Sequence, residues 1–331
     1  MPQPPKITIG IPAYNRPREL RDAVESILSQ LDSDSQAQLE ILICDDCSSG
    51  DMPAIAKDYA EKRPGLIRYH RNSTNLGYSR NVHSLFQRGT GEYVWLLGDD
   101  DALEPGALRR VLETLQQYPD LAVLFLGSRA YDATLQQRLT PPSAEDTPAQ
   151  VRYFPSGREM FAQTGQLACA LLSSNVIHRA KWLAEDLDSA FASIAIHANA
   201  TMKILAHSSG ALLAEPLIKC RTSNSPRGRW VDDGYPFNFF FGIIACWTHE
   251  CRSLYPSRIY HAHHTVLLRG LVADLIRARK QRYPVNRRAF VRRVRASCSQ
   301  TAPMSWLLML MPYIPRALLI TADKIYARHR R

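Results

Sequence analysis

The sequence predicts an α/β fold, in which a sheet is covered by helices on both faces, followed by a basic helical extension. Three observations predict it. The first 130 residues alternate short β-rich apolar runs with segments of helical period, which is typical of βαβ units. The predicted strands end in polar clusters, and the last 80 residues are rich in arginine. With 331 residues and 45% apolar composition, the chain is long enough to bury a sizeable core.

The elements of the first part follow from the hydrophobic period. A first strand is predicted over 6–11, and a helix over 18–31 places Leu20, Val24 and Ile27 on one face. Further strands are predicted over 39–44, 66–70, 93–97 and 121–126, and further helices over 78–88 and 105–118. This alternation predicts parallel strands joined by helical crossovers.

The pattern loosens over 128–155, which contains four prolines and many polar residues and is interpreted as an insertion or a long loop. Periodicity then returns over 158–166, followed by a strand around 171–178, a helix over about 194–207 and a strand over 211–220. We place the division between two domains at residue 250, so that the first spans 1–250 and the second 251–331.

The net charge of +10 is unevenly distributed. Residues 252–331 carry 17 Lys and Arg against two acids, so this tail has a charge of +15 and the rest of the chain −5. Basic helices are predicted over 266–280 and 287–295. The run 303–322 is strongly apolar, but Pro312, Pro315 and Arg316 argue against a spanning helix and favour a segment that lies in the membrane interface.

The charge of the tail predicts an anionic partner. A membrane surface and nucleic acid would both attract it, and the apolar run favours the membrane, so we expect no nucleic acid. The seven cysteines form no even framework and no signal pattern precedes Ile7, which predicts a reducing cytoplasm. The expected location is the cytoplasm, peripheral to the inner face of the cell membrane.

Four predicted strands each end in a distinct polar cluster, at 12–15, 45–46, 75–80 and 99–101. Because ligands bind just outside the carboxyl ends of the strands in open α/β sheets, we expect these clusters to converge. The same turns lack the Gly-rich signatures of dinucleotide-binding and Walker loops. A phosphate bound here would therefore need a metal ion or arginine to neutralise it.

Three consecutive carboxylates, Asp99, Asp100 and Asp101, follow the apolar run 93–97. They would repel one another unless a cation lay among them. Hard oxygen ligands suit Mg²⁺ or Mn²⁺, which commonly keep waters and bridge diphosphate oxygens. In the alternative interpretation, Asp101 caps the helix that begins near residue 105 and its neighbours are solvated.

The order of these motifs resembles glycosyltransferase family 2. The matching runs are Ile7 to Arg16 (ITIGIPAYNR), Ile43 to Ser49 (ICDDCSS), Asn75 to Asn81 (NLGYSRN) and Gly91 to Asp101 (GEYVWLLGDDD), within about residues 5 to 225. The resemblance implies the single-domain A-type fold, with a Rossmann-like mixed sheet. The run WLLGDDD and the later run Pro216 to Asn224 are similar to bacterial O-antigen transferases of the abequosyltransferase type.

The resemblance also implies roles for single residues. Pro12 and Tyr14 would contact the nucleotide base together with Asn15 of the same motif, and Asp46 would accept a hydrogen bond from the base or ribose. Asp99 would approach the ribose. The residues implied for the phosphates and the metal are Arg80 for the donor phosphate, Asp100 for the metal and Asp101 as a second ligand.

The basic loop 221–229 follows a predicted strand, and we expect it to close over the diphosphate through Arg221 and Arg227. Inverting transfer also needs a general base, which family members usually supply as an Asp or Glu at the start of a helix. The corresponding run 191–200 contains no acid. His197 is our first candidate because imidazole titrates near neutrality, and Asp186 and Asp188 are the alternatives.

The predicted activity is inverting transfer of a hexosyl or deoxyhexosyl group from a nucleotide diphosphate sugar to a lipid-linked or polysaccharide acceptor, in O-antigen-like surface glycan biosynthesis. The domain over 1–250 would bind the nucleotide sugar, and the tail over 251–331 the membrane surface or the acceptor. One rival is a nucleotidyltransferase, although the run Ile9 to Tyr14 lacks the Gly-rich signature of that class. The other is a non-catalytic nucleic-acid binder acting through the tail.

Overall fold

The structure is a computed structural model that describes residues 6–139, 150–164, 171–222, 238–280, 286–298 and 308–314. The chain forms two compact units. Unit 1 consists of Met1–Phe191 and Ile196–Asn224, and unit 2 of Ala192–Ala195 and Ser225–Arg331. The functional division into 1–250 and 251–331 stays a prediction.

Unit 1 is built on a mixed sheet, which confirms the predicted fold class. In the described part of the chain the sheet has nine strands in the order β3-β2-β1-β4-β8-β6-β9-β5, and β7 pairs with β9. The strands that pair in parallel at one side of the sheet are β1 (Ile7–Ala13), β2 (Leu39–Asp45), β3 (Ile67–Arg71) and β4 (Tyr93–Leu96). The remaining strands are β5 (Ala102–Leu103), β6 (Val123–Tyr131), β7 (Arg152–Phe154), β8 (Asn175–His178) and β9 (Gly210–Arg221).

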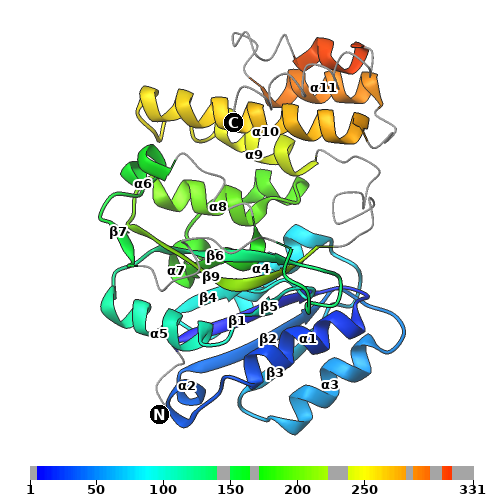
Figure 1. The fold of residues 1–331 in the computed structure, drawn as a ribbon, viewed down its shortest axis with the longest axis vertical. Coiled ribbons are helices and arrows are strands. Elements are labelled where there is room, and N and C mark those ends of the chain that lie inside the picture. Colours follow the sequence, from blue (N-terminus) through cyan, green and yellow to red (C-terminus); the bar gives the residue numbers. More distant parts are fainter. Residues whose placement is uncertain are drawn as a thin grey trace. The chain divides into compact units, whose positions relative to one another are not determined.

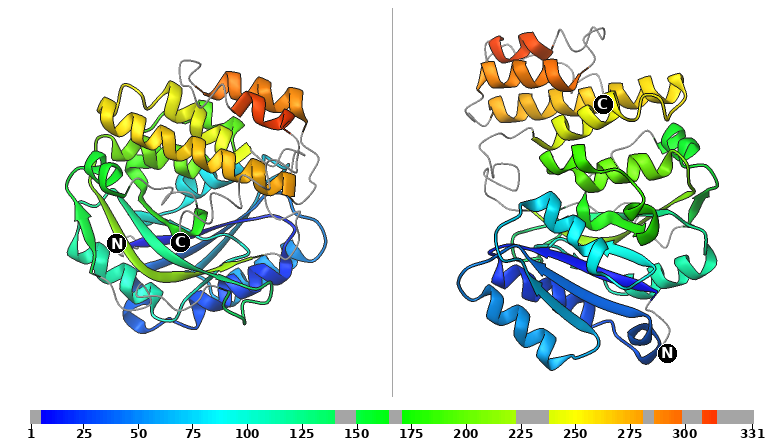
Figure 2. Two further views of the ribbon diagram at one scale, coloured as in Figure 1. Left: turned by 45° about the horizontal axis from the view of Figure 1, so that its top comes forward. Right: turned by 180° about the vertical axis from the view of Figure 1, so that it is seen from behind.

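Helices cover both faces of this sheet, as predicted (Figure 1). The helices of unit 1 are α1 (Pro17–Leu28), α2 (Ser33–Ala37), α3 (Met52–Lys62), α4 (Tyr78–Arg88), α5 (Ala107–Gln117), α6 (Gly157–Thr164), α7 (Arg179–Leu183) and α8 (Ile196–Leu205). Two 3-10 turns, η2 (Leu172–Ser174) and η3 (Asp188–Ala192), lie beside β8 and before α8. Figure 2 (right) shows α1 and α3 on the face opposite α4.

The alternating side chains of β1 explain why both faces are covered. Ile7, Ile9 and Ile11 belong to the core cluster that also contains the apolar faces of α1, α3 and α5. The other face meets α4 at Gly10, where an added Cβ would lie 3.1 Å from the side chain of Leu85. Every residue of β1 and β2 is buried, as expected for parallel strands covered on both sides.

The interpretation of 128–155 as a long loop is partly wrong. β6 continues to Tyr131, and β7 begins at Arg152. Both pair with β9, and the register of β6 shifts on either side of Gly127, where a Cβ would lie 2.2 Å from the carbonyl oxygen of Ala214. The long-range pairing with β9 therefore turns part of a polar, proline-containing segment into strand.

Two short elements differ from the prediction because local contacts decide them. The expected strand over 171–178 begins as the turn η2, and only 175–178 forms β8, antiparallel to β4. The helix α2 was not predicted. Asp32 caps it by accepting a hydrogen bond from the Ser35 amide (2.8 Å), while the Ser35 hydroxyl accepts from the Asp32 amide.

Unit 2 is helical. Its elements are α9 (Asn238–His249), α10 (Ser257–Lys280), α11 (Arg287–Ser297) and the 3-10 turn η4 (Met311–Tyr313). Trp247 of α9 donates a hydrogen bond to the carbonyl oxygen of Tyr260 (3.0 Å) and stacks on its ring. Within the described ranges, no helix combines the length and apolarity needed to cross a membrane.

Candidate functional site

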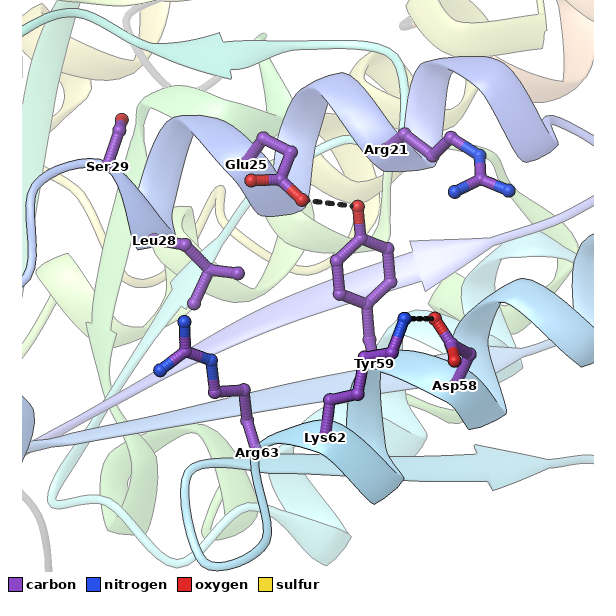
Figure 3. A pocket seen from close by; sticks show the side chains of 8 residues that line it. All are labelled: Arg21, Glu25, Leu28, Ser29, Asp58, Tyr59, Lys62 and Arg63. Atoms are coloured by element: carbon purple, nitrogen blue, oxygen red, sulfur yellow. Dashed lines mark hydrogen bonds and ion pairs between the residues drawn. The ribbon is translucent and has the colours of Figure 1, made fainter.

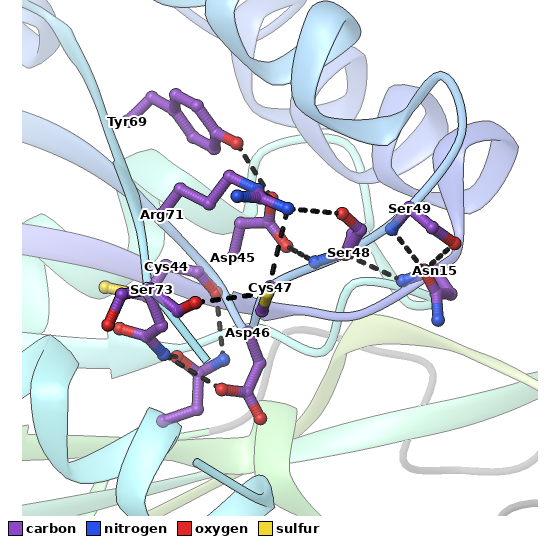
Figure 4. Close-up of polar contacts among 12 residues, drawn as sticks. Asn15, Cys44, Asp45, Asp46, Cys47, Ser48, Ser49, Tyr69, Arg71 and Ser73 are labelled. Carbon is purple, nitrogen blue, oxygen red and sulfur yellow. Dashed lines mark hydrogen bonds and ion pairs between the residues drawn. The ribbon is translucent and has the colours of Figure 1, made fainter. Parts of the chain in front are cut away.

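The turns that follow β1 and β2 bind each other directly (Figure 4). Asn15 has a left-handed backbone with φ of 53°, and its amide donates to the Ser48 hydroxyl (2.9 Å). The Asn15 side-chain oxygen accepts from the Ser49 amide (2.9 Å). The first two polar clusters therefore meet at one edge of the sheet, as predicted. Asn15 acts within the protein here, by shaping the turn that carries Tyr14 and Arg16.

Asp99 and Asp100, which follow β4, lie at the same edge of the sheet and bind the turn after β1. The Tyr14 amide donates to Asp99 Oδ2 (3.1 Å), and Arg16 Nη1 donates to Asp99 Oδ1 (2.9 Å) and Asp100 Oδ2 (3.2 Å). Burial, opposed by Arg16 and reinforced by neighbouring Asp100, raises the pKa of Asp99 to about 7. Sequence reasoning missed Arg16, although it follows the first polar cluster directly.

Asp101 points into the protein. Its Oδ2 accepts from the Ser173 hydroxyl (2.6 Å), and its Oδ1 from the Arg221 amide (3.1 Å). The alternative that Asp101 caps the next helix is wrong, because the residue at the N-cap of α5 is Gly106. The three adjacent carboxylates are all buried, and they thus divide into a pair bound by Arg16 and one that fixes the turn.

Arg221 also serves this turn. Its Nε donates to the carbonyl oxygen of Asp100 (2.8 Å), its Nη2 to Asp22 (2.6 Å), and its Nη1 to the carbonyl oxygen of Ala133. Each guanidinium nitrogen is therefore engaged within the protein, which differs from the predicted contact with a donor diphosphate. Arg227 lies outside the described residues.

Asp46 organises the third cluster. Its carboxylate accepts from the amides of Leu76 (2.8 Å) and Gly77 (2.9 Å) and from the side chain of Asn72 (2.9 Å). These bonds hold the turn before α4 against the end of β2. Pro12 is buried at the end of β1, whereas the Tyr14 side chain is 47% exposed beside the carboxylate pair. The predicted clusters at 12–15, 45–46, 75–80 and 99–101 thus lie together.

Arg80 lies in the first turn of α4, and among the described residues it forms no hydrogen bond or ion pair with Asp99 or Asp100. Its guanidinium carbon lies 4.6 Å from the ring centre of Phe191. His83, on the next turn, meets the edge of the same ring and accepts a hydrogen bond from Trp182 (3.1 Å). Sequence reasoning missed Phe191 and His83. The exposed Arg80 side chain is therefore backed by an aromatic cluster.

The three candidates for the general base are not brought together. His197, at the start of α8, is 2% exposed, and its Nδ1 lies 3.3 Å from the Tyr78 hydroxyl. Asp186 and Asp188 are exposed in the segment after α7, where the Asp186 side chain accepts from the Asp188 amide (3.1 Å). In the described residues, no bond given by the structure joins either aspartate to Asp99 or Asp100.

A pocket of about 380 Å³ lies between the second halves of α1 and α3. Figure 3 shows Tyr59 of α3 reaching across to Glu25 of α1, to which its hydroxyl donates (2.7 Å). Burial, followed by the effect of Glu25, raises the pKa of Tyr59 to about 12. This pocket contains none of the strand-end residues and is separate from the candidate site.

The carboxylates of Asp99 and Asp100 are the oxygen ligands that this edge of the sheet offers to a divalent cation. One oxygen of Asp99 and one of Asp100 already bind the same positive group, the guanidinium of Arg16. No group of three or more His, Cys, Asp or Glu residues that could hold a metal occurs within the described ranges. An ion here would therefore complete its shell with diphosphate oxygens and water, as Mg²⁺ and Mn²⁺ commonly do.

Sequence comparison gives one family and several relatives. The family model described as "Glycosyl transferase family 2" matches residues 8–180. EpsE of Bacillus subtilis is 30% identical over 128 residues, which cover 39% of this chain and only 45% of EpsE. "Abequosyltransferase RfbV" of Salmonella typhimurium is 25% identical over 231 residues, covering 66% of this chain and 67% of that protein.

Structural comparison gives the fold. Residues 1–349 of TarS from S. aureus, solved in complex with UDP, match with a TM-score of 0.63 at 14% identity, over 96% of this chain and 87% of that one. The mannosyltransferase PcManGT from Pyrobaculum calidifontis, solved with GDP-Man and Mn²⁺, matches with a TM-score of 0.56 at 16% identity, over 97% and 86%. The motif order, the mixed sheet and the family match over more than half of its length place this chain in glycosyltransferase family 2, with the A-type fold.

Proposed function

We propose that the chain transfers a sugar, with inversion, from a nucleotide diphosphate donor to a lipid-linked or polysaccharide acceptor in bacterial surface glycan biosynthesis. One observation carries the proposal: Tyr14, Arg16, Asp99 and Asp100 meet at the carboxyl ends of β1 and β4, beside the turns held by Asp46. The similarity to a protein named abequosyltransferase supports a surface glycan, and transfer of a hexosyl or deoxyhexosyl group.

The donor would lie along this edge of the sheet. The exposed ring of Tyr14 offers an apolar surface for the base, and Pro12 fixes the strand end below it. Asp46 would act at the base or ribose end, and Asp99 would approach the ribose. Arg80, exposed and backed by Phe191, would pair with a donor phosphate through charge-assisted bonds.

Asp100, with Asp99 beside it, would hold Mg²⁺ or Mn²⁺. When bound, the ion would neutralise the charge that develops on the leaving diphosphate. We assign Asp101 and Arg221 to the support of this site, because Ser173 and the backbone of Asp100 engage them within the protein. A carboxylate held in a fixed turn keeps the geometry that selective ion binding needs.

Inverting transfer needs a base that removes the proton from the acceptor hydroxyl as it attacks the anomeric carbon. His197 occupies the position that the family motif gives to the base, but its ring is buried against Tyr78. Asp186 and Asp188 face solvent. Their exposure favours one of these two carboxylates as the base and a packing role for His197.

The basic tail would bring the enzyme to an anionic membrane surface, where a lipid-linked acceptor lies. Phe290 and Val294 of α11 are buried, whereas Arg288, Arg292 and Arg295 are exposed. Each basic residue near such a surface contributes about 1 kcal/mol. The location that follows is cytoplasmic and peripheral to the inner face of the membrane.

An exposed apolar patch accompanies these arginines. Leu310 and Tyr313 of the η4 region are exposed, and Arg287 of α11 lies over the Tyr313 ring at 5.6 Å. Charge together with apolar contact is what an interfacial segment provides, whereas non-specific binding to a nucleic-acid duplex comes almost entirely from charge. This combination favours a membrane over nucleic acid.

A donor screen tests the proposed activity. The full chain is incubated with Mn²⁺ and UDP, GDP, CDP or dTDP sugars, and the released nucleotide is identified by chromatography. Glycosyl transfer or donor hydrolysis releases a nucleoside diphosphate, whereas the rival nucleotidyltransferase, given a nucleoside triphosphate and a sugar 1-phosphate in a parallel assay, would release pyrophosphate. Pyrophosphate as the product would refute the proposal.

A further inference from the structure

The Arg16 guanidinium covers the carboxylate pair of Asp99 and Asp100. Its Nη1 donates to Asp99 (2.9 Å) and Asp100 (3.2 Å) at once. The Arg16 side chain is 41% exposed, whereas those of Asp99 and Asp100 are 6% and 12% exposed. The arginine therefore lies on the solvent side of the pair.

The carboxylates are held firmly, in contrast to the arginine above them. The Tyr14 amide holds Asp99 (3.1 Å), and Arg221 holds the backbone of Asp100 (2.8 Å). Ser173 fixes the adjacent Asp101 (2.6 Å). A cation that enters between these carboxylates must therefore move Arg16, because the Asp99 carboxylate and the Asp100 backbone are held by other groups.

The Arg16 side chain can move away from Asp99 and Asp100 while the backbone of the turn stays in place. Asn15 is pinned at φ of 53° by Ser48 and Ser49, and Pro17 begins α1 directly after Arg16. Because fixed residues stand on both sides, movement is confined to the long Arg16 side chain. That side chain would remain beside the donor, where a diphosphate offers it new acceptors.

We propose that Arg16 is an internal counter-ion that competes with the divalent metal for Asp99 and Asp100, and that couples metal binding to donor binding. This inference rests on the proposed function, since it assumes a metal and a diphosphate at this edge. Without a nucleotide, the metal must displace Arg16 from the carboxylates of Asp99 and Asp100. With a nucleoside diphosphate present, the released guanidinium gains phosphate oxygens, so each ligand strengthens the binding of the other.

The test measures Mn²⁺ binding to the full chain by electron paramagnetic resonance and calorimetry, alone and with UDP, GDP, CDP or dTDP. We expect Arg16→Ala to bind Mn²⁺ alone at least about fivefold more tightly than the natural protein, within the usual range of such couplings. The nucleotide should also enhance Mn²⁺ binding less in Arg16→Ala, because the contribution of Arg16 is lost while coordination by the diphosphate remains, and Arg16→Lys should lie between the two proteins.

Arg18→Ala is the matched control, because it removes the same charge from an exposed position on α1. It should behave like the natural protein, and circular dichroism should show that all variants are folded. Equal or weaker Mn²⁺ binding by folded Arg16→Ala would overturn the competition while leaving the proposed function intact. If no protein bound Mn²⁺ with any nucleotide, both the competition and the proposed metal dependence would be lost.

Discussion

The Nε of Arg221 donates a hydrogen bond to the carbonyl oxygen of Asp100 (2.8 Å), which ties the end of β9 to the turn after β4. The same guanidinium reaches Asp22 of α1 (2.6 Å). We predict that Arg221→Ala lowers the free energy of unfolding by about 1–3 kcal/mol, because it leaves the carbonyl oxygen of the buried Asp100 without a charged donor. Urea unfolding followed by tryptophan fluorescence would measure the change.

Arg109→Ala serves as the control for this variant. The Arg109 side chain is 74% exposed and pairs with Asp32 only at 3.6 Å, so its loss should cost less than about 1 kcal/mol. Arg221→Lys should recover little, because a single ammonium cannot reproduce three directed contacts. Equal unfolding midpoints for Arg221→Ala and Arg109→Ala would show that the Arg221 contacts do not stabilise the site.

The base is tested by single substitutions. We expect Asp186→Asn or Asp188→Asn to lower kcat by about 10²–10⁴, the range of general base catalysis, with donor binding unchanged. His197→Asn should chiefly lower stability, because the ring packs against Tyr78. If His197→Asn alone removed kcat while its melting temperature stayed at that of the natural protein, the imidazole would be the base and our preference would be wrong.

Glu40 should make the stability depend on pH in the acid range. Burial raises its pKa, but hydrogen bonds from Thr8, the Thr90 amide and Arg68 outweigh burial and leave the pKa below its usual value of 4.5. A lowered folded-state pKa contributes stability above pH 4.5, which is lost as the pH falls through the folded value. Glu40→Gln should thus unfold more easily than the natural protein at pH 7, by about 1–3 kcal/mol.

Urea unfolding of both proteins between pH 7 and pH 3 would measure this difference. We expect the difference between their free energies of unfolding to become smaller toward pH 3, because the Glu40 carboxylate of the natural protein gains a proton. Glu61→Gln, at an exposed site, is the control and should change little. A difference in free energy of unfolding that stayed constant or grew on acidification would contradict the role assigned to the ionised Glu40.

Membrane binding should depend on both charge and apolar contact in unit 2. We predict that replacing Arg288, Arg292 and Arg295 with Ala weakens flotation on vesicles containing anionic lipid, at about 1 kcal/mol per residue. Replacing Leu310 and Tyr313 with Ser should weaken it further. Neutral vesicles should bind poorly.

Two controls make the flotation test specific. Replacing Arg18, Arg63 and Arg109 with Ala removes the same charge from exposed positions of unit 1 and should leave flotation intact. Deletion of residues 303–331 should abolish most of it. The membrane proposal would fail if the changes in unit 2 left flotation unaffected. It would also fail if the protein bound nucleic acid and that binding depended on the three arginines but not on Leu310 and Tyr313.

Local patterns in the sequence predicted most of the sheet and the four polar clusters, because strand period and strand-end position are local properties. The helix over Tyr78–Arg88 has the predicted bounds. The placement of β8 between β4 and β6, antiparallel to both, was not predictable from period. Strand pairing across such sequence separations depends on packing that no single segment encodes.

In the candidate site, too, contacts between residues distant in sequence could not be predicted. Asp99 and Asp100 were found from their sequence alone, but the inward orientation of Asp101 depends on Ser173 and Arg221, which are distant in sequence. Arg16 reaches the carboxylates because Asn15 adopts a left-handed backbone, a conformation that sequence only weakly indicates. The burial of His197 likewise follows from its packing against α4.

The central claim is that Asp100 holds a metal ion that a nucleotide-sugar reaction needs, and one measurement tests it most directly. Release of nucleoside diphosphate is measured for the natural protein, Asp100→Asn and the exposed control Asp58→Asn, with Mn²⁺ and with EDTA. We predict that Asp100→Asn loses at least about a hundredfold in rate, that EDTA abolishes the natural activity, and that Asp58→Asn is unaffected. Full activity of Asp100→Asn with any nucleotide sugar would contradict the account.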